Sequence, residues 1–397
     1  MDEEHAVTLL TELAGRFCGP AGRAAGRYRI GIAGVVRDMV VTDEGCRVEP
    51  AAGRPDAGLE TDAATWARVH SGETSCLEAV LAGRMEVTGS IDRGLRFEPL
   101  FAFPAGGRLF YRVERVAFGG GAITTLVAGA EGSPPLLLLH GLGATKASWL
   151  PMLPALARKF RVLAVDLPGF GSSDKPHAPY DAPYFTERLF RLLDHFDVPF
   201  SFVAGNSMGG RIAMEMAMTN PDRIAAIACL CPASAYLRRP ALLFVRLTRP
   251  ELAVAAPRLP RARVQAVTRR LFADPTRVPV HWMTAAMDDF LNTWEDPAAR
   301  LAFARSARSI YLDEPLGDAG FWTRLGAMRT PALYLYGTGD RVITHRLAAD
   351  VERTLPGAEV VVWDDCGHVP QIEHPQRTAD ALIDFFGRTS SNERRAV

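Results

Sequence analysis

Ser207 stands at the centre of a pattern that could perform nucleophilic chemistry, Gly205-Asn206-Ser207-Met208-Gly209-Gly210. The apolar run 202–204 precedes this pattern, and a helical pattern follows it through Met214, Met216 and Met218. This order predicts a strand, a sharp turn and a helix, the context in which Gly-x-Ser-x-Gly presents a reactive hydroxyl. The turn needs small residues two positions before and after the serine, because a Cβ there would strike the backbone. The alternative is a glycine-rich turn with an incidental serine, since five-residue patterns recur by chance.

Length and composition set limits on what surrounds this serine. With 397 residues, 48% of them hydrophobic and 23% charged, the chain is long enough for two or three globular domains. Its formal net charge is zero, so no overall field favours nucleic acid as a partner. The acidic start is not followed by the apolar stretch of a signal peptide, and apolar runs such as 136–139 are too short to span a bilayer.

The cysteines show neither metal-ligand spacing nor a dense disulfide framework. They are Cys18, Cys46, Cys76, Cys229, Cys231 and Cys366. We therefore expect reduced thiols in a cytoplasmic protein.

The first hundred residues read as a small α+β unit. Apolar residues recur at helical spacing over 3–17, and a glycine-rich loop follows over 15–26. Short alternating runs predict strands at 28–32, 39–41, 46–48 and 59–62, and a last strand at 85–91. Two short helices are expected at 64–69 and 76–81, the first with an N-cap at Thr61 or Asp62.

Part of this unit resembles the sterol-carrier-protein type 2 family. The likeness is clearest over 59–100 and rests on Leu59-Glu60-Thr61-Asp62, on 66–73 and on 78–90. The resemblance implies a domain over 1–105 with an apolar tunnel for fatty acyl chains or sterols, joined to the rest near Ala105-Gly106-Gly107. The alternative is that its apolar residues form only a core, and no binding residue is named; they are Trp66, Val69, Leu77, Val80 and Leu81.

Downstream, strands alternate with helices. A hairpin is expected over 112–116 and 122–128, followed by strands at 136–139, 162–165, 202–206, 224–231, 331–336 and 360–363. Helices are expected at 149–156, 184–196 and 378–386. This alternation predicts an α/β fold with a doubly wound, mostly parallel sheet over 110–390. The segment 233–328 has helical patterns and no convincing strand pair, which indicates a helical cap over the ligand-binding edge of the sheet.

Several motifs of this second region together resemble the α/β-hydrolase family over about 110–388. They are His140-Gly141-Leu142-Gly143, Asp166-Leu167-Pro168-Gly169-Phe170-Gly171, the Ser207 pattern, Gly339-Asp340 and Gly367-His368. The resemblance implies that Ser207 is the nucleophile, His368 the general base and Asp340 the acid that orients it. It also implies an oxyanion hole made by the backbone N–H groups of Leu142 and Met208.

Other residues compete for these roles. Asp364 and Asp365 are alternatives to Asp340 as the acid, but they lie too near His368 in sequence for the family's pattern. His374 is expected at the surface. His140 and Asp166 are expected to support their loops rather than to react.

A serine at the turn excludes the dehalogenases and epoxide hydrolases of this fold, which carry an aspartate there. Ester or thioester hydrolysis, acyl transfer, peroxide chemistry and cleavage of a C–C bond beside a ketone remain. The Gly-Asn-Ser-Met-Gly-Gly run is shared with the C–C hydrolases of aromatic and steroid ring degradation. Those relatives, however, place a tryptophan after the histidine and a Ser/Gly-rich oxyanion loop, where this chain has Val369 and Leu142.

These two departures favour the esterases and lipases of the monoacylglycerol-lipase kind. The sequence therefore predicts a serine hydrolase that cleaves an apolar, lipid-like acyl ester through an acyl-enzyme, with no metal or organic cofactor. The alternatives are a C–C hydrolase of a ring-cleavage diketone and a lipid carrier with an inactive hydrolase scaffold. Acyl chain length and oligomeric state stay open.

The expected cap carries arginines beside an apolar run. Arg238, Arg239, Arg246 and Arg249 flank the apolar residues of 242–247. Such a stripe can contact an anionic membrane surface. The alternative is an ordinary cap helix whose arginines cover apolar surface with their stems.

Overall fold

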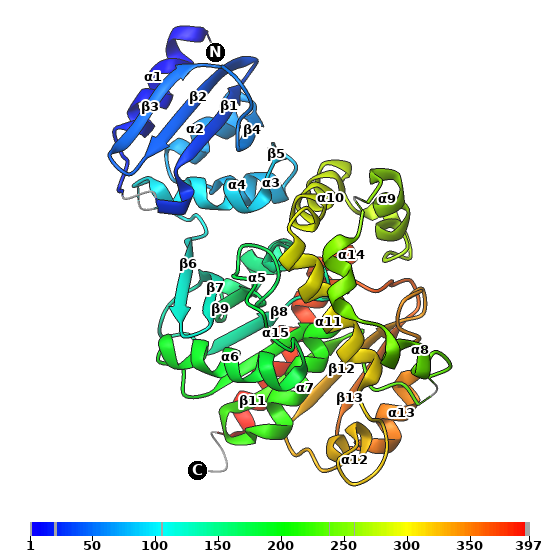
Figure 1. Ribbon diagram of the computed structural model, residues 1–397. Coiled ribbons are helices and arrows are strands. Elements are labelled where there is room, and N and C mark those ends of the chain that lie inside the picture. Colours follow the sequence, from blue (N-terminus) through cyan, green and yellow to red (C-terminus); the bar gives the residue numbers. More distant parts are fainter. Residues whose placement is uncertain (1, 20–21, 105, 238, 258, 394–397) are drawn as a thin grey trace. The chain divides into compact units, whose positions relative to one another are not determined.

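The computed structural model describes residues 2–19, 22–104, 106–237, 239–257 and 259–393, so Ala105 and Arg238 lie outside the described residues. The chain forms two compact units (Figure 1). Unit 1 comprises Met1–Val113 and Pro279–Asp289, and unit 2 comprises Glu114–Val278 and Phe290–Val397.

Unit 1 contains a five-stranded mixed sheet in the order β3-β2-β1-β4-β5. The strands are β1 (Gly26–Ile32), β2 (Val35–Thr42), β3 (Gly45–Pro50), β4 (Ala57–Thr61) and β5 (Met85–Gly89). Strands β1 and β4 pair in parallel, and the other neighbours pair antiparallel. The helices are α1 (Glu3–Ala14), η1 (Gly22–Ala24), α2 (Ala63–His70), α3 (Cys76–Leu81), α4 (Ile91–Phe97) and η2 (Glu98–Leu100). The predicted α+β character is confirmed, while α4 was not predicted.

Local signals in the sequence explain the helix starts of unit 1. The Asp62 side chain accepts the N–H of Thr65 and caps α2, as one of the two expected N-caps. Ser75 and Glu78 form a reciprocal capping box at the start of α3. Trp66 and Val69 on α2 are fully buried in the core of unit 1.

The segment after Gly106 is anchored to unit 1 by two carboxylates, the buried Glu98 and the half-buried Glu78. Glu98 is buried, forms an ion pair with Arg108 at 2.9 Å and accepts a hydrogen bond from the Tyr111 hydroxyl. The backbone N–H of Leu109 donates to the Glu78 carboxylate at 3.0 Å. Burial raises the pKa of Glu98 to about 7 although Arg108 opposes the shift. The connection expected near 105–107 is therefore packed on unit 1 up to Val113.

Unit 2 contains an eight-stranded sheet in the order β13-β12-β11-β10-β8-β9-β7-β6. The strands are β6 (Tyr111–Phe118), β7 (Gly121–Ala128), β8 (Pro135–Leu139), β9 (Arg161–Asp166), β10 (Ser201–Asn206), β11 (Ile224–Leu230), β12 (Ala332–Gly337) and β13 (Glu359–Trp363). Strands β8 to β13 pair in parallel, and β7 pairs with β9 antiparallel. The predicted mostly parallel sheet is confirmed. Its central strands are buried along their whole length, which explains their continuous apolar runs.

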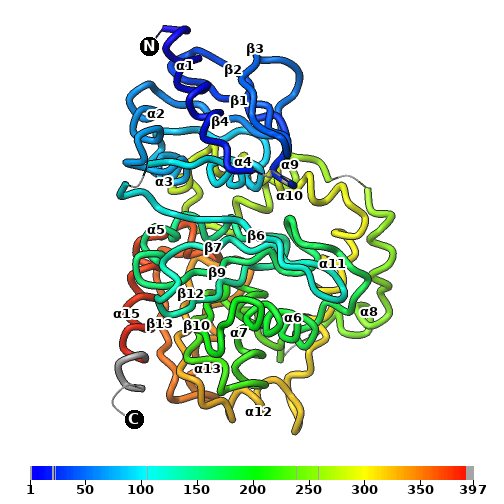
Figure 2. The backbone as a smooth tube through the Cα atoms, turned by 90° about the vertical axis from the view of Figure 1, so that its left-hand side faces the viewer, coloured from blue at the N-terminus to red at the C-terminus, as the bar shows by residue number. Residues whose placement is uncertain are grey.

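Helices cover both faces of this sheet (Figure 2), where α15 lies on one side and α6 and α7 on the other. They are η3 (Lys146–Met152), α5 (Leu153–Ala157), α6 (Ala182–His195), α7 (Met208–Thr219), η4 (Pro221–Arg223), α13 (Leu347–Thr354), α14 (Pro370–Glu373) and α15 (Pro375–Glu393). The sequence patterns predicted α6, α7 and the core of α15, but they missed α13.

The segment between β11 and β12 contains helices joined by loops and no strand among its described residues, which agrees with the predicted helical insertion. It contains α8 (Leu242–Leu247), η5 (Pro250–Ala255), α9 (Arg261–Arg269), η6 (Pro275–Arg277), α10 (Val280–Trp294), α11 (Pro297–Leu312) and α12 (Phe321–Gly326). One part of this segment does not belong with the rest, although the sequence predicted a single cap over 233–328. Residues Pro279–Asp289, which include the first part of α10, belong to unit 1, where Trp282 packs against the core.

Candidate active site

Ser207 lies between β10 and α7 in a strained conformation, with φ 52° and ψ −113°. A positive φ is unfavourable for a residue with a Cβ and persists only where the surroundings fix it. Here the Ser207 N–H donates to the carbonyl of Leu230 at 2.9 Å, and its carbonyl accepts the N–H of Ala233 at 3.0 Å. The predicted strand, sharp turn and helix are confirmed.

The glycines around Ser207 are required by close backbone approach. A Cβ at Gly205 would lie 2.2 Å from the carbonyl oxygen of Gly209, and a Cβ at Gly209 would lie 2.1 Å from that of Leu139. Both distances are far below any van der Waals contact, so the expected need for small residues at these positions is confirmed. The turn therefore fixes α7 against the ends of β8 and β10.

His368 and Asp340 meet at the same edge of the sheet, where the parallel strands β10, β12 and β13 end. The Nδ1 atom of His368 lies 2.8 Å from Oδ2 of Asp340. A carboxylate can only accept, so Nδ1 carries a proton, and in the neutral ring Nε2 is then the nitrogen with the free lone pair. The other carboxylate oxygen of Asp340 accepts the N–H groups of Val342 at 2.7 Å and Ile343 at 2.9 Å.

The neighbour of Ser207 joins the turn to the histidine loop. The side-chain amide of Asn206 donates to the carbonyls of His368 at 2.9 Å and of Leu230 at 3.0 Å. Of the rival acids, Asp365 contacts Arg277 and Arg377 instead of His368. Asp364 is exposed. The structure thus brings His368 together with Asp340 and ties that loop to the residue before Ser207.

The loop after β8 lies directly beside the serine. A Cβ placed at Gly141 would be 3.3 Å from Cβ of Ser207, which locates the next residue, Leu142, close to the turn. Met208 is the first residue of α7, so its N–H has no acceptor within the helix. Leu142 and Met208, the two residues of the predicted oxyanion hole, therefore both lie near Ser207.

His140 supports this loop, as expected. It is fully buried, its Nε2 accepts the N–H of Leu167 at 3.0 Å, and its Nδ1 lies 2.7 Å from the carbonyl oxygen of Gly141. The proton must therefore be on Nδ1. Burial lowers the pKa of His140, which favours the same neutral ring.

Asp166 also supports its loop. Its carboxylate lies 2.8 Å from Nζ of Lys146 in a fully buried ion pair and accepts the N–H groups of Lys146 and Ser172. No pattern in the sequence singled out Lys146. A lone lysine at the first position of η3 gives no local signal of burial, because only the tertiary fold places it beside the acid.

Comparison with known proteins identifies the family. Residues 134–375 match the family model described as alpha/beta hydrolase fold. The chain belongs to the α/β-hydrolase fold family.

Relatives of this hydrolase carry several activities. The dihydrolipoyllysine-residue acetyltransferase component of the acetoin cleaving system of Pseudomonas putida is 32% identical over 69% of this chain and 69% of its own. A bacterial membrane phospholipase A is similar in structure, with a TM-score of 0.58 and 29% identity over 70% of this chain and 87% of its own. A 2-hydroxy-6-oxo-6-phenylhexa-2,4-dienoate hydrolase of a Rhodococcus strain has a TM-score of 0.59 and 28% identity, over 70% of this chain and 99% of its own.

A cavity of about 920 Å³ reaches Met208 from the cap side of the hydrolase. Apolar side chains such as Ile212 and Leu247 line it together with guanidinium groups. At its wall, the buried Arg211 pairs with Glu215 at 2.8 Å and Asp313 at 2.5 Å. A much smaller aromatic pocket borders Gly143 and is lined by Phe290, Trp294 and Phe303.

Two groups of described residues bring possible metal ligands within 4.8 Å of one another. One contains Cys231, Asp340 and His368, and the other Cys366, Glu373 and His374. In the first group Asp340 already accepts three hydrogen bonds. In the second, Glu373 accepts three backbone N–H groups. Among the described residues, no helix is both long and apolar enough to cross a membrane.

The backbone contact at Gly209 gives a test of the turn. Gly209→Ala should greatly reduce the yield of folded protein, because its methyl group would overlap the Leu139 carbonyl unless α7 moves. Gly132→Ala is the matched control, since its Cβ meets no atom within 4 Å. Thermal unfolding of both variants measures the difference. Equal stability of the two would show that the turn tolerates a Cβ.

Proposed function

We propose that the protein is a serine hydrolase that cleaves an apolar, lipid-like acyl ester. Ser207 is the nucleophile, His368 the general base and Asp340 the acid that orients the imidazole. The hydrogen bond between His368 and Asp340 carries this proposal, because it leaves Nε2 as a base at the sheet edge that holds Ser207. Ester hydrolysis also fits Val369 and Leu142, where C–C hydrolases place a tryptophan and a Ser/Gly-rich loop.

In this mechanism Nε2 of His368 takes the proton of the Ser207 hydroxyl as the oxygen attacks the ester carbonyl. The N–H groups of Leu142 and Met208 stabilise the oxyanion, and each such donor typically contributes about 3 kcal/mol to the transition state. His368 then protonates the leaving alcohol as the C–O bond breaks, which leaves an acyl-enzyme. Water, deprotonated by His368, attacks the acyl-enzyme and releases the acid and the free serine.

Substrate turnover distinguishes the ester hydrolase from two alternatives, a C–C hydrolase and a lipid carrier with an inactive hydrolase scaffold. The Rhodococcus relative is named as a dienoate hydrolase and the other structure as a phospholipase, and the cavity beside Met208 is large enough for a long acyl chain. A C–C hydrolase would turn over a ring-cleavage diketone faster than a medium-chain ester. A lipid carrier with an inactive scaffold would turn over neither.

The first test removes the nucleophile. Ser207→Ala should abolish labelling by a fluorophosphonate and lower ester turnover roughly 10⁶-fold, because the catalytic residues act as a unit. His368→Ala should behave alike, and Asp340→Asn should lose about 10⁴-fold. Turnover is measured on p-nitrophenyl esters of rising chain length and on a ring-cleavage diketone. Unchanged ester turnover by Ser207→Ala would refute the mechanism, and faster turnover of the diketone would favour the C–C hydrolase.

We further propose that the cap docks on anionic lipid through α8 and η5. None of the residues of these two elements is buried, and the exposed fractions are 72% for Leu243, 73% for Phe244, 73% for Leu247 and 69% for Leu252. Of the flanking arginines, Arg239 pairs with Glu314, whereas Arg246 and Arg249 have no ion-pair partner among the described residues. Leu247 and Arg249 also line the cavity beside Met208, so the apolar surface adjoins a path toward the catalytic turn.

Vesicle sedimentation tests this surface. The protein should sediment with phosphatidylglycerol vesicles and much less with phosphatidylcholine vesicles, because guanidinium groups attract anionic headgroups. Phe244→Asp should weaken binding, whereas Phe200→Asp should not, although Phe200, just before β10, is also half exposed. Failure to bind either vesicle, or equal loss in both variants, would contradict docking through α8.

For unit 1 we propose a fatty acyl or sterol-like ligand, supported by the resemblance of 59–100 to the sterol-carrier family and by the apolar core around Trp66. Deleting residues 1–105 would also uncover Trp282, since Pro279–Asp289 belongs to unit 1. A test that leaves Trp282 covered uses the whole chain with Ser207 blocked by a fluorophosphonate. A fluorescent fatty acid should still bind at one site per chain; absence of binding would leave unit 1 as a structural domain only.

A further inference from the structure

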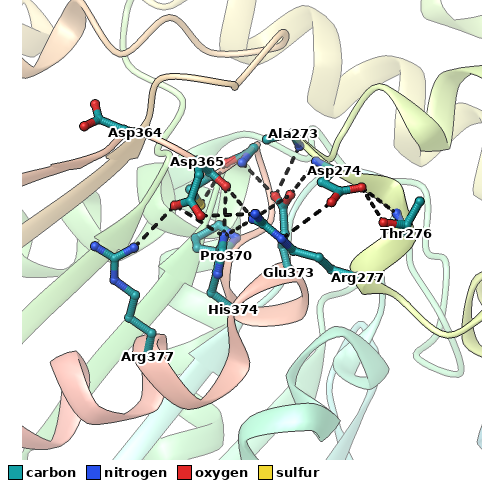
Figure 3. Close-up of polar contacts among 12 residues, drawn as sticks. Ala273, Asp274, Thr276, Arg277, Asp364, Asp365, Pro370, Glu373, His374 and Arg377 are labelled. Atoms are coloured by element: carbon teal, nitrogen blue, oxygen red, sulfur yellow. Dashed lines mark hydrogen bonds and ion pairs between the residues drawn. The ribbon is translucent and has the colours of Figure 1, made fainter.

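Two segments of unit 2 converge on the carboxylate of Glu373, the last residue of α14 (Figure 3). Its side chain is fully buried. One oxygen accepts the N–H of Asp274 at 2.7 Å, and the other accepts those of Gly367 at 2.7 Å and Ala273 at 3.3 Å. A buried carboxylate needs such donors, because an unpaired charge away from water is very costly. Glu373 therefore holds a cap segment and the histidine loop to each other.

The cap segment, 271–277, also touches the histidine directly. The N–H of His368 donates to the carbonyl of Leu271 at 2.6 Å. A Cβ at Gly367 would lie only 2.5 Å from the same oxygen, so the two backbones are in close contact. On the other side of the residue, Asn206 binds the His368 carbonyl. The backbone of His368 is thus fixed by the cap at its N–H and by the neighbour of Ser207 at its carbonyl.

Arg277 forms an outer brace between the same two segments. Its guanidinium donates to the carbonyl of Asp365 at 2.7 Å and to its carboxylate at 3.1 Å, and lies 2.9 Å from Nε2 of His374 (Figure 3). His374, expected at the surface, is instead half-buried and packs edge-on against Trp363. These contacts are partly exposed, so each contributes less than the buried ones of Glu373.

We propose that Glu373 is a positioning residue for His368, and that it acts by locking the cap segment 271–277 onto the histidine loop. This inference rests on the proposed role of His368 as the general base. The carbonyl of Leu271 can hold the His368 N–H only while Ala273 and Asp274 stay bound to Glu373. Segment 271–277 is then a fixed edge of the cap, and the orientation of the imidazole depends on a cap contact far from Ser207 in sequence.

The main variant is Glu373→Gln, which keeps the size of the side chain but turns one acceptor into an amide NH₂ that faces a backbone N–H. It should lower kcat about 10- to 100-fold with little change in KM, since small displacements of a catalytic group cost rate rather than binding. Rates are normalised to sites titrated by a fluorophosphonate, so unfolded protein does not count. Arg377→Met is the matched control, because Arg377 contacts Asp365 but not Glu373. Its kcat should stay within about twofold of the wild type.

Hydrogen exchange gives a readout that needs no catalysis. In full-length Ser207→Ala protein, adding Glu373→Gln should speed exchange together in peptides covering 268–277 and 364–372, and not in α15 or β10. Arg277→Met, which removes the more exposed brace, should speed hydrogen exchange in the same peptides by a smaller factor. This second variant keeps the proposal testable if Glu373→Gln does not fold. Unchanged kcat per titrated site, or exchange that rises over the whole chain, would overturn the positioning role. Retained activity of Ser207→Ala would instead refute the proposed function and leave the exchange result standing.

Discussion

The crossing of β10, α7 and β8 at Ser207 is the constraint on which the rest of unit 2 depends. The missing Cβ atoms of Gly205 and Gly209 let the backbones meet at distances that no other residue allows. This contact sets the height of α7 over the sheet, and with it the position of the Met208 N–H. The strain at Ser207 is local, but the hydrogen bonds that hold this residue involve Leu230 at the end of β11 and Ala233 in the segment that follows.

Irregular loops at the edge of a parallel sheet create a second problem, because their backbone groups have no ladder partner. Each loop here is stabilised by a buried polar side chain. His140 holds the loop after β8, Asp166 with Lys146 holds the loop after β9, and Glu373 holds the loop after β13. These residues have side chains that could do chemistry, yet their partners are backbone groups or fully paired charges. These contacts hold the edge of the sheet rigid around Ser207 and His368.

The sequence could predict the features that local patterns encode. The strand, turn and helix around Ser207, the parallel sheet and the helical insertion all follow from apolar periodicity and glycine placement over short windows. The order of the motifs also singled out Asp340 over Asp364 and Asp365, and the structure pairs it with His368. Short helices such as α4 and α13 were missed because the patterns there are too short to separate from loops.

Contacts between distant segments could not be predicted in the same way. Nothing near Glu373 indicates that its partners are Ala273 and Asp274, a hundred residues earlier. Lys146 similarly looks like a surface residue until β9 brings Asp166 beside it. The division of α10 between the two units depends on Trp282 packing against a core whose residues lie between Leu10 and Phe101. Such pairings are properties of the tertiary fold and not of any window of sequence.

The cap of unit 2 consequently has two parts with different physical character. Segment 271–277 is tied to the histidine loop by a buried carboxylate, so moving it would take the N–H donors of Ala273 and Asp274 away from a buried charge. The elements α8 and η5 have no buried residue, and elements with few buried contacts open at the lowest free-energy cost. They also border the cavity that reaches Met208. Under the proposed function, an apolar substrate would enter along α8, where the cap can yield, while segment 271–277 would hold His368 in place.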